Sequence, residues 1–185
     1  MSIKLSLILL IACCLSLSSV SPHKNAGMQT DPGVPLPFIM KLPNSQWHLA
    51  VNEAPGHYIF KREPIKDAEG RDIIPAIMIY VEDASEYKQD VSLFWSRKMQ
   101  PLTDNGVKVG KVLIQQDKDY PLSFKNAVFV TGTYTDSGVA HIIYMIYIID
   151  KHNKGIQVYL DMTSELQAQY GQEFWTTVRS LKEVE

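Results

Sequence analysis

Five histidines are the first residues to weigh for chemistry, because imidazole serves as an acid, a base or a metal ligand near neutral pH. They are His23, His48, His57, His141 and His152. None stands in a metal-binding frame such as H-E-x-x-H. A hairpin around residues 54–56 would bring His48 and His57 opposite each other, and we interpret that pair as structural or solvated. We expect His141 and His152 to be surface residues beside turns, so the histidines predict no metal site.

Nucleophiles and phosphate-binding loops give no stronger signal. The chain lacks the G-x-S-x-G sequence of a serine nucleophile elbow. Both cysteines, Cys13 and Cys14, lie in the N-terminal apolar segment. Residues 106–111 resemble a P-loop superficially, but their spacing is wrong and a strand pattern follows instead of a helix. We therefore expect no catalytic residue and no cofactor.

Carboxylates offer two weak candidates for a site. Asp117 and Asp119 could ligate calcium, but calcium loops generally bring more carboxylates and a glycine at the sharp bend. Glu82 and Asp83, at one strand end, could form a paired-carboxylate site with Asp161. Capping of the following helix explains Asp83 adequately.

The N-terminal segment predicts export. Residues 1–21 contain one early basic residue, Lys4, and then an apolar stretch over residues 5–17, which is the layout of a secretory signal. The stretch falls short of the about 20 apolar residues that span a bilayer. Two processing sites stay open: Leu-Ile-Ala-Cys resembles a bacterial lipobox and would lipidate Cys13, whereas small residues near Ser18 and Ser21 suit ordinary cleavage. We expect a periplasmic, cell-surface tethered or secreted protein.

The charge composition limits the classes of partner that we expect. The chain carries 18 Lys plus Arg against 20 Asp plus Glu, without a basic stripe, so we expect no nucleic-acid partner. For the same reason we expect membrane contact only through the signal or a lipid anchor. Both cysteines lie in the signal segment, so the folded part contains none and its core alone must hold the fold. Roughly 160 residues suffice, because a domain of that size buries about 70% of its unfolded surface.

Prolines mark the next segment, residues 22–45, which contains five of the ten in the chain. We predict an extended linker or strap there, because proline fixes φ and donates no hydrogen bond. Phe38, Ile39 and Met40 suggest that its second half docks and covers a sheet edge or groove. Residues 46–185 are predicted to form one globular domain.

Alternating apolar residues in that domain predict a sheet. The expected strands cover residues 46–52, 57–63, 74–82, 107–116, 127–135, 139–150 and 155–163. Both faces of residues 139–149 are apolar, so we place this strand in the middle of the sheet. The sequence Thr-Asp-Ser-Gly at 135–138 predicts a tight hairpin.

Two helices are expected to cover the sheet. One is predicted over residues 84–99, with Asp83 and Glu86 as a capping box and Pro101 as its end. The other is predicted over residues 165–182, with Ser164 and Gln167 as its capping box. Three tryptophans (Trp47, Trp95 and Trp175) could line a ligand cleft, but two lie on or beside the apolar helix stripes, so core packing is favoured. The fold class is therefore α+β, an antiparallel sheet of about six or seven strands sandwiched between helices.

The order of these elements resembles the PsbP-like superfamily. The resemblance covers residues 45–182 and rests on GIQVYLDMT at 155–163, followed by a helix that closes in FWTTVRSLK at 174–182. The strand at 74–82 leading into a helix, and the start Gln46-Trp47-His48, fit the same plan. That superfamily includes the extrinsic PsbP proteins of photosystem II, Mog-type nuclear-transport proteins and many bacterial exported proteins. The resemblance implies an α/β/α sandwich and a binding or assembly-accessory role, and it transfers no functional residue.

These observations favour a noncatalytic extracytoplasmic protein that binds another protein or a membrane-associated complex. Two alternatives stay open. One is an extracytoplasmic hydrolase with a carboxylate or histidine site, and the other is a carrier of a small apolar ligand held between sheet and helix. Fold analogy alone does not decide among them.

Overall fold

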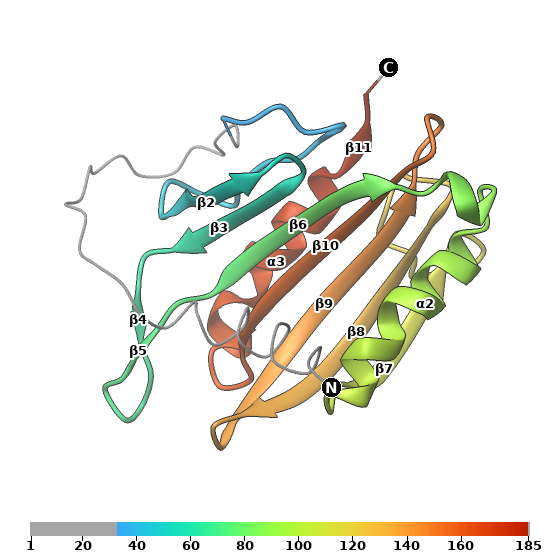
Figure 1. Cartoon of the computed structure of the whole chain (residues 1–185). Helices are drawn as coiled ribbons and strands as arrows, with labels where there is room; N and C mark the ends of the chain where they lie inside the picture. The colour runs from blue at the N-terminus through green and yellow to red at the C-terminus, as the bar shows by residue number, and fades with distance from the viewer. Residues whose placement is uncertain (1–32, 185) are drawn as a thin grey trace.

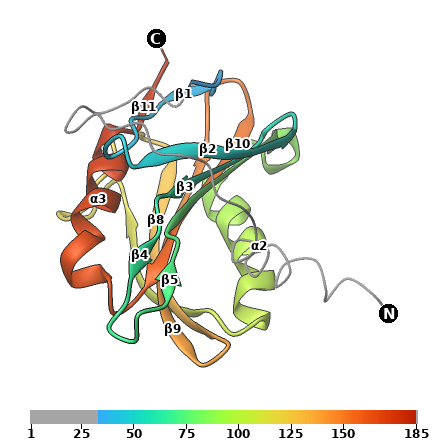
Figure 2. The same ribbon diagram turned by 90° about the vertical axis from the view of Figure 1, so that its left-hand side faces the viewer.

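One antiparallel sheet forms the centre of the molecule, with a helix packed on each face (Figures 1 and 2). The structure is a computed structural model, and it describes residues 33–184. The predicted α+β sandwich is confirmed. The N-terminal segment with Cys13, and the first part of the strap, lie outside the described residues.

Seven strands make up the sheet, in the order β2-β3-β6-β10-β9-β8-β7. Their bounds are β2 Trp47–Ala54, β3 His57–Arg62, β6 Ala76–Asp83, β7 Lys108–Ile114, β8 Ala127–Asp136, β9 Val139–Ile149 and β10 Lys154–Thr163. Short strands form two small separate sheets: β1 (Phe38–Ile39) with β11 (Lys182–Glu183), and β4 (Ile65–Lys66) with β5 (Asp72–Ile73).

The middle of the sheet is β10, and β9 lies one strand away from it. Every residue of β10 after Lys154 is buried. In β9 burial is complete only from Ile143 onward, because the β8–β9 hairpin projects at one end of the sheet (Figure 1). The prediction that residues 139–149 are interior and covered on both faces therefore holds for the last seven residues and fails for the first four.

The β8–β9 connection is a two-residue turn. Asp136 pairs with Val139, and Ser137 and Gly138 both have positive φ, of 50° and 83°. Two successive residues with positive φ are what a tight hairpin turn of the primed type requires. The predicted hairpin is thus confirmed.

Helix α2 (Val91–Asp104) begins later and ends later than the sequence suggested. Its cap is Asp90, whose carboxylate accepts from the Leu93 N–H at 2.9 Å. Asp83 instead accepts from the Ser85 N–H just before a short 3-10 turn, η2 (Ser85–Tyr87), whose cap residue is Ala84. The predicted capping box at Asp83 is wrong because Lys88 and Gln89 have positive φ, which interrupts a helix.

Pro101 lies inside α2 and does not end it. Proline removes one intrahelical hydrogen bond, but its own φ suits a helix. The buried Leu102 holds the last turn against the sheet, and the Asn105 N–H closes it on the carbonyls of Pro101 and Leu102.

Helix α3 (Gln167–Ser180) has no side-chain cap, so the predicted Ser164 and Gln167 capping box is also wrong. The buried Leu166 occupies the cap position. The neighbouring Glu165 points elsewhere, and its carboxylate accepts from the Ala68 N–H in the β4–β5 loop at 2.7 Å. Neither helix is long and apolar enough to cross a membrane, nor is any other helix within residues 33–184.

Each face of the sheet carries its own core. The α3 side is the larger and includes Phe60, Phe129, Ile146 and Phe174. Three strap residues join it, because Phe38, Met40 and Leu42 are each only 3% exposed. The second half of the strap therefore packs as part of the core. The α2 side is built around aromatic and methionine side chains (Met78, Phe94, Met145, Tyr147 and Tyr159).

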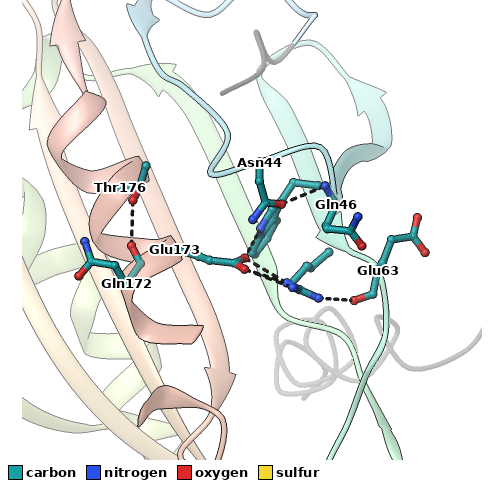
Figure 3. Close-up of polar contacts among 8 residues, drawn as sticks. Asn44, Gln46, Glu63, Gln172, Glu173 and Thr176 are labelled. Carbon is teal, nitrogen blue, oxygen red and sulfur yellow. Dashed lines mark hydrogen bonds and ion pairs between the residues drawn. The ribbon is translucent and has the colours of Figure 1, made fainter. Parts of the chain in front are cut away.

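A polar clamp joins α3 to β2 and β3. The Glu173 carboxylate accepts from Trp47 Nε1 at 2.6 Å and from Arg62 Nε at 3.0 Å. Figure 3 shows Glu173 reaching from α3 toward these strands. The Trp47 ring packs on Phe174 with centroids 6.0 Å apart. Trp47 is thus a core residue, as predicted, and its N–H is satisfied by Glu173.

Candidate binding site at the β8–β9 hairpin

A pocket of about 90 Å³ opens at the end of the sheet where the β8–β9 hairpin projects. We call it the hairpin pocket. The hairpin, the bend between β5 and β6, and the end of β10 enclose it. Its lining residues are Ile73, Ile74, Ala76, Met78, Asp136, Ser137, Val139, His141, Asp161, Met162 and Thr163. Asp161 and Thr163 alternate with Tyr159 along β10, so all three side chains point to the α2 side of the sheet.

His141 brings the polar atoms of the pocket together. Its Nδ1 lies 3.2 Å from Asp161 Oδ1 and 3.2 Å from the Tyr134 hydroxyl. The Tyr134 ring stacks on the imidazole with centroids 4.7 Å apart. A carboxylate can only accept, so we assign the Nδ1 proton to the bond with Asp161, which leaves Nε2 of a neutral ring as an acceptor. The side chains of His141 and Asp161 are only 16% and 13% exposed.

Thr163 has an unusual environment beside this pair. It lies directly opposite His141 in the β9–β10 register and is 3% exposed. Its hydroxyl is the one buried side-chain polar atom within residues 33–184 that has no hydrogen-bond partner. A buried hydroxyl without a partner costs about 1–3 kcal/mol. Because Thr163 also lines the hairpin pocket, we interpret its hydroxyl as a group that a bound molecule would satisfy.

A wider hollow of about 300 Å³ adjoins the hairpin pocket and shares Ser137, Val139 and Thr163 with it, and we call this hollow the mouth. Its further lining is mostly charged, from Asp67, Glu69, Arg71 and Glu165. The β4–β5 loop supplies the first three, and in Figures 1 and 2 this loop and the β8–β9 hairpin lie at the same end of the sheet.

The β4–β5 loop is fixed by Asp67. Its carboxylate accepts from the N–H groups of Glu69 and Arg71 and from Arg71 Nε, the last at 2.6 Å. Burial alone would raise the pKa of Asp67, but the hydrogen bonds and the charge of Arg71 outweigh it and lower the pKa below its ordinary value of 3.8. Arg71 also pairs with Glu69 at 2.9 Å. The one guanidinium at the mouth is therefore already engaged.

Among the residues singled out from the sequence, His141 and Asp161 are brought together, and the prediction of His141 as a surface residue is wrong. His48 lies opposite Lys61 and not opposite His57, because the turn pairs His57 with Ala54, six residues along the strand from His48. His48 instead contacts Glu63 at 3.7 Å. His152 is exposed in its turn, as expected.

The proposed pairing of Glu82 and Asp83 with Asp161 is wrong. Glu82 lies opposite Gly155 and Asp161 lies opposite Ala76, six residues farther along the strand pair. At about 3.3 Å per residue this places them roughly 20 Å apart. Glu82 pairs with Lys98 at 2.7 Å.

Asp117 closes a turn by accepting from the Ile114 N–H at 2.8 Å. In the described part of the chain no three His, Cys, Asp or Glu side chains gather as metal ligands. Sequence reasoning did not find Thr163 or Asp67, and the signal was faint for both. A threonine at the end of a strand and an aspartate in a polar loop are common. Only the strand register reveals that Thr163 lies opposite His141.

The edge strand β7 also exposes apolar side chains. Val109, Val112 and Ile114 are 41%, 38% and 43% exposed. The strand also carries Lys108 and Lys111 and a register shift between Val109 and Val112. Lysines and bulges are devices that keep a sheet edge from pairing with other chains. We interpret β7 as a protected edge.

Several solved structures resemble this fold, and two of them are PA94 and LpqN. PA94 from Pseudomonas aeruginosa, a protein of unknown function, aligns over 76% of this chain and 99% of its own length, with a TM-score of 0.53 and 13% identity. LpqN, involved in cell envelope biogenesis of Mycobacterium tuberculosis, aligns over 85% of this chain and 90% of its own, with a TM-score of 0.52 and 12% identity. Identities this low show a shared fold alone.

No protein-family model matches the sequence, and no curated protein matches it. The resemblance to the PsbP-like superfamily therefore stays a prediction about ancestry, while the sheet flanked by helices is observed.

Proposed function

We propose that this protein is a noncatalytic, exported binding protein of the cell envelope, and that the hairpin pocket is its ligand site. One observation carries the proposal: Thr163, whose buried hydroxyl has no hydrogen-bond partner within residues 33–184, is a lining residue of a largely apolar pocket. Ligand sites typically combine apolar walls with a few convergent polar groups, and His141, Asp161 and Thr163 are such groups here.

Two further observations support the envelope location. The N-terminal residues have the layout of an export signal. LpqN, which shares the fold, is involved in cell envelope biogenesis in its own organism. Under this proposal Cys13 is either the lipidated N-terminus or is removed with the signal. Binding to another protein or to a membrane-associated complex, as a PsbP-like accessory would show, stays a prediction.

Xenon tests the pocket without regard to charge, because it is a small apolar atom that enters apolar cavities. Methyl spectra of the full chain under xenon pressure should show shifts at Ile73, Met78 and Val139. Val139→Trp should fill the pocket and abolish the shifts at Ile73 and Met78. The matched control is Val112→Trp on the exposed edge strand, which should leave them unchanged. Shifts that are absent from the parent protein, or that persist in Val139→Trp, would contradict the proposal.

The His141 and Asp161 pair favours one alternative, an exported hydrolase. In that chemistry Asp161 would orient the imidazole through Nδ1, and the hydroxyl of Ser137 or Thr163 would act as nucleophile. The assay is hydrolysis of p-nitrophenyl acetate by the full chain and by His141→Ala. Equal hydrolysis rates for the two proteins would exclude the hydrolase alternative. Faster hydrolysis by the parent protein would contradict the noncatalytic proposal.

A further inference from the structure

We infer that the hairpin pocket takes a small primary amine, with its apolar body in the recess and its ammonium group between Asp161 and Thr163. This inference rests on the proposed function and adds the chemical class of the ligand. It depends on the charge of the walls, on the hydrogen-bonding capacity of the lining, and on the size of the recess.

The charge of the walls is strongly negative. Five carboxylates line the recess and its mouth (Asp67, Glu69, Asp136, Asp161 and Glu165). The one guanidinium, Arg71, is already paired with Asp67 and Glu69. Such a wall attracts a cation and repels an anion, and low-dielectric surroundings strengthen both effects.

Two hydrogen-bond acceptors of the recess, on Asp161 and Thr163, are left without a donor among the described residues. Within residues 33–184 the Asp161 carboxylate has His141 as its hydrogen-bond partner, so Oδ2 is left to accept. The Ser137 hydroxyl is used locally, since it donates to Asp136 at 3.3 Å. The Thr163 hydroxyl has two lone pairs and no partner. An ammonium group brings three donors, which suits this set better than a carboxylate, which can only accept.

The recess fixes the size of the apolar body. Its volume of about 90 Å³ admits only a few heavy atoms, because one water already needs roughly 10–15 Å³ by such a measure. Ile73, Met78 and Val139 provide its apolar walls. A branched chain of about four carbons fits this space.

Three molecules of nearly one shape and different charge provide the test: isobutylamine, isobutanol and isobutyrate. Each is titrated at pH 7 into the full chain, and the shifts of the His141 ring and of the Thr163 and Val139 amides are followed. The amine should bind about tenfold more tightly than the alcohol, the scale of one hydrogen-bonded charge pair. Isobutyrate should bind most weakly.

Asp161→Asn keeps the shape of the side chain and removes its negative charge. The affinity for isobutylamine should therefore fall to that for isobutanol. Asp119→Asn, an exposed change far along the chain, is the matched control and should leave the tenfold preference intact. If Asp161→Asn does not fold, Asp136→Asn on the hairpin should weaken the amine selectively.

Equal binding of the amine and the alcohol would overturn the ligand class and leave the pocket as a site for neutral molecules. Strongest binding by isobutyrate would also overturn the ligand class, because the site would then prefer an anion, with Arg71 as its partner. Absence of any shift at the pocket, together with a negative xenon experiment, would overturn the proposed function as well.

Discussion

His141 Nδ1 lies 3.2 Å from Asp161 Oδ1, although 20 residues separate the two in the chain. The β9–β10 register pairs His141 with Thr163 and pairs Asp161 with Ile143, so the imidazole reaches its carboxylate diagonally across two strands. Diagonal neighbours on one face are within reach of an aromatic side chain. The polar end of the hairpin pocket is thus a product of strand register.

Thr163→Val should raise the free energy of unfolding by about 1 kcal/mol, because it replaces a buried hydroxyl without a partner by a methyl group of similar size. Valine also suits a strand. Urea denaturation measures the effect. The matched control is Thr177→Val in α3, which removes a buried hydroxyl that donates to the Lys41 carbonyl at 3.2 Å. That variant should lose about 1 kcal/mol. Destabilisation of both variants to the same degree would show that Thr163 has a partner in solution.

Glu173→Ala should lower the free energy of unfolding by about 2 kcal/mol. This is less than for a fully buried ion pair, because the pair of Arg62 and Glu173 retains some exposure. The Arg62 and Glu173 side chains are 12% and 17% exposed, and the change would also leave Trp47 Nε1 without its acceptor. Gln172→Ala, on the exposed side of the same helix, is the control and should change stability by less than about 0.5 kcal/mol. Similar decreases in the free energy of unfolding of the two variants would show that the clamp does not stabilise the fold.

Asp67 should make the β4–β5 loop sensitive to acid. Its pKa is lower in the folded protein than the ordinary 3.8, so the unfolded chain binds a proton more readily. The stabilisation is complete above the ordinary pKa and is lost as pH falls through the lowered one. Carboxyl ¹³C shifts should give Asp67 a midpoint below 3.8, and Asp67→Asn should flatten the acid limb of the stability curve. A midpoint above 3.8 would contradict the loop geometry.

Fractionation of the source cells tests export and the two processing alternatives. We expect the mature protein outside the cytoplasm, with residues 1–21 partly or wholly removed. If the lipobox is used, Cys13→Ser should release the protein from the membrane fraction. If cleavage falls near Ser18 or Ser21, intact mass should show an unacylated N-terminus and the variant should fractionate like the parent. A full-length protein retained in the cytoplasm would contradict the envelope proposal.

Sequence patterns predicted the architecture well because burial imposes strong periodicity. The apolar pattern of residues 127–163 matches the three strands β8, β9 and β10, and the apolar stripe of residues 166–181 matches α3. The predicted caps failed because polar residues near a helix start have several competing uses. Asp83 closes a short turn, and Glu165 reaches a loop nearly 100 residues away in the chain. Local sequence does not encode that choice.

The candidate site could not be predicted from the sequence for a related reason. Its residues come from β5, β6, β8, β9 and β10, and no two of its polar groups form a recognisable motif. The expected pairing of His48 with His57 failed because the turn pairs His57 with Ala54. Long-range register, which tertiary packing sets, decides which polar side chains meet.

The location of a bound amine is the most direct test of the site. Intermolecular nuclear Overhauser effects between the methyl groups of isobutylamine and the full chain would report it. The pocket geometry predicts contacts from the ligand to Val139, Met78 and the Thr163 methyl group. Contacts elsewhere on the surface, or none at a concentration where the His141 resonances shift, would contradict the assignment of the hairpin pocket as the ligand site.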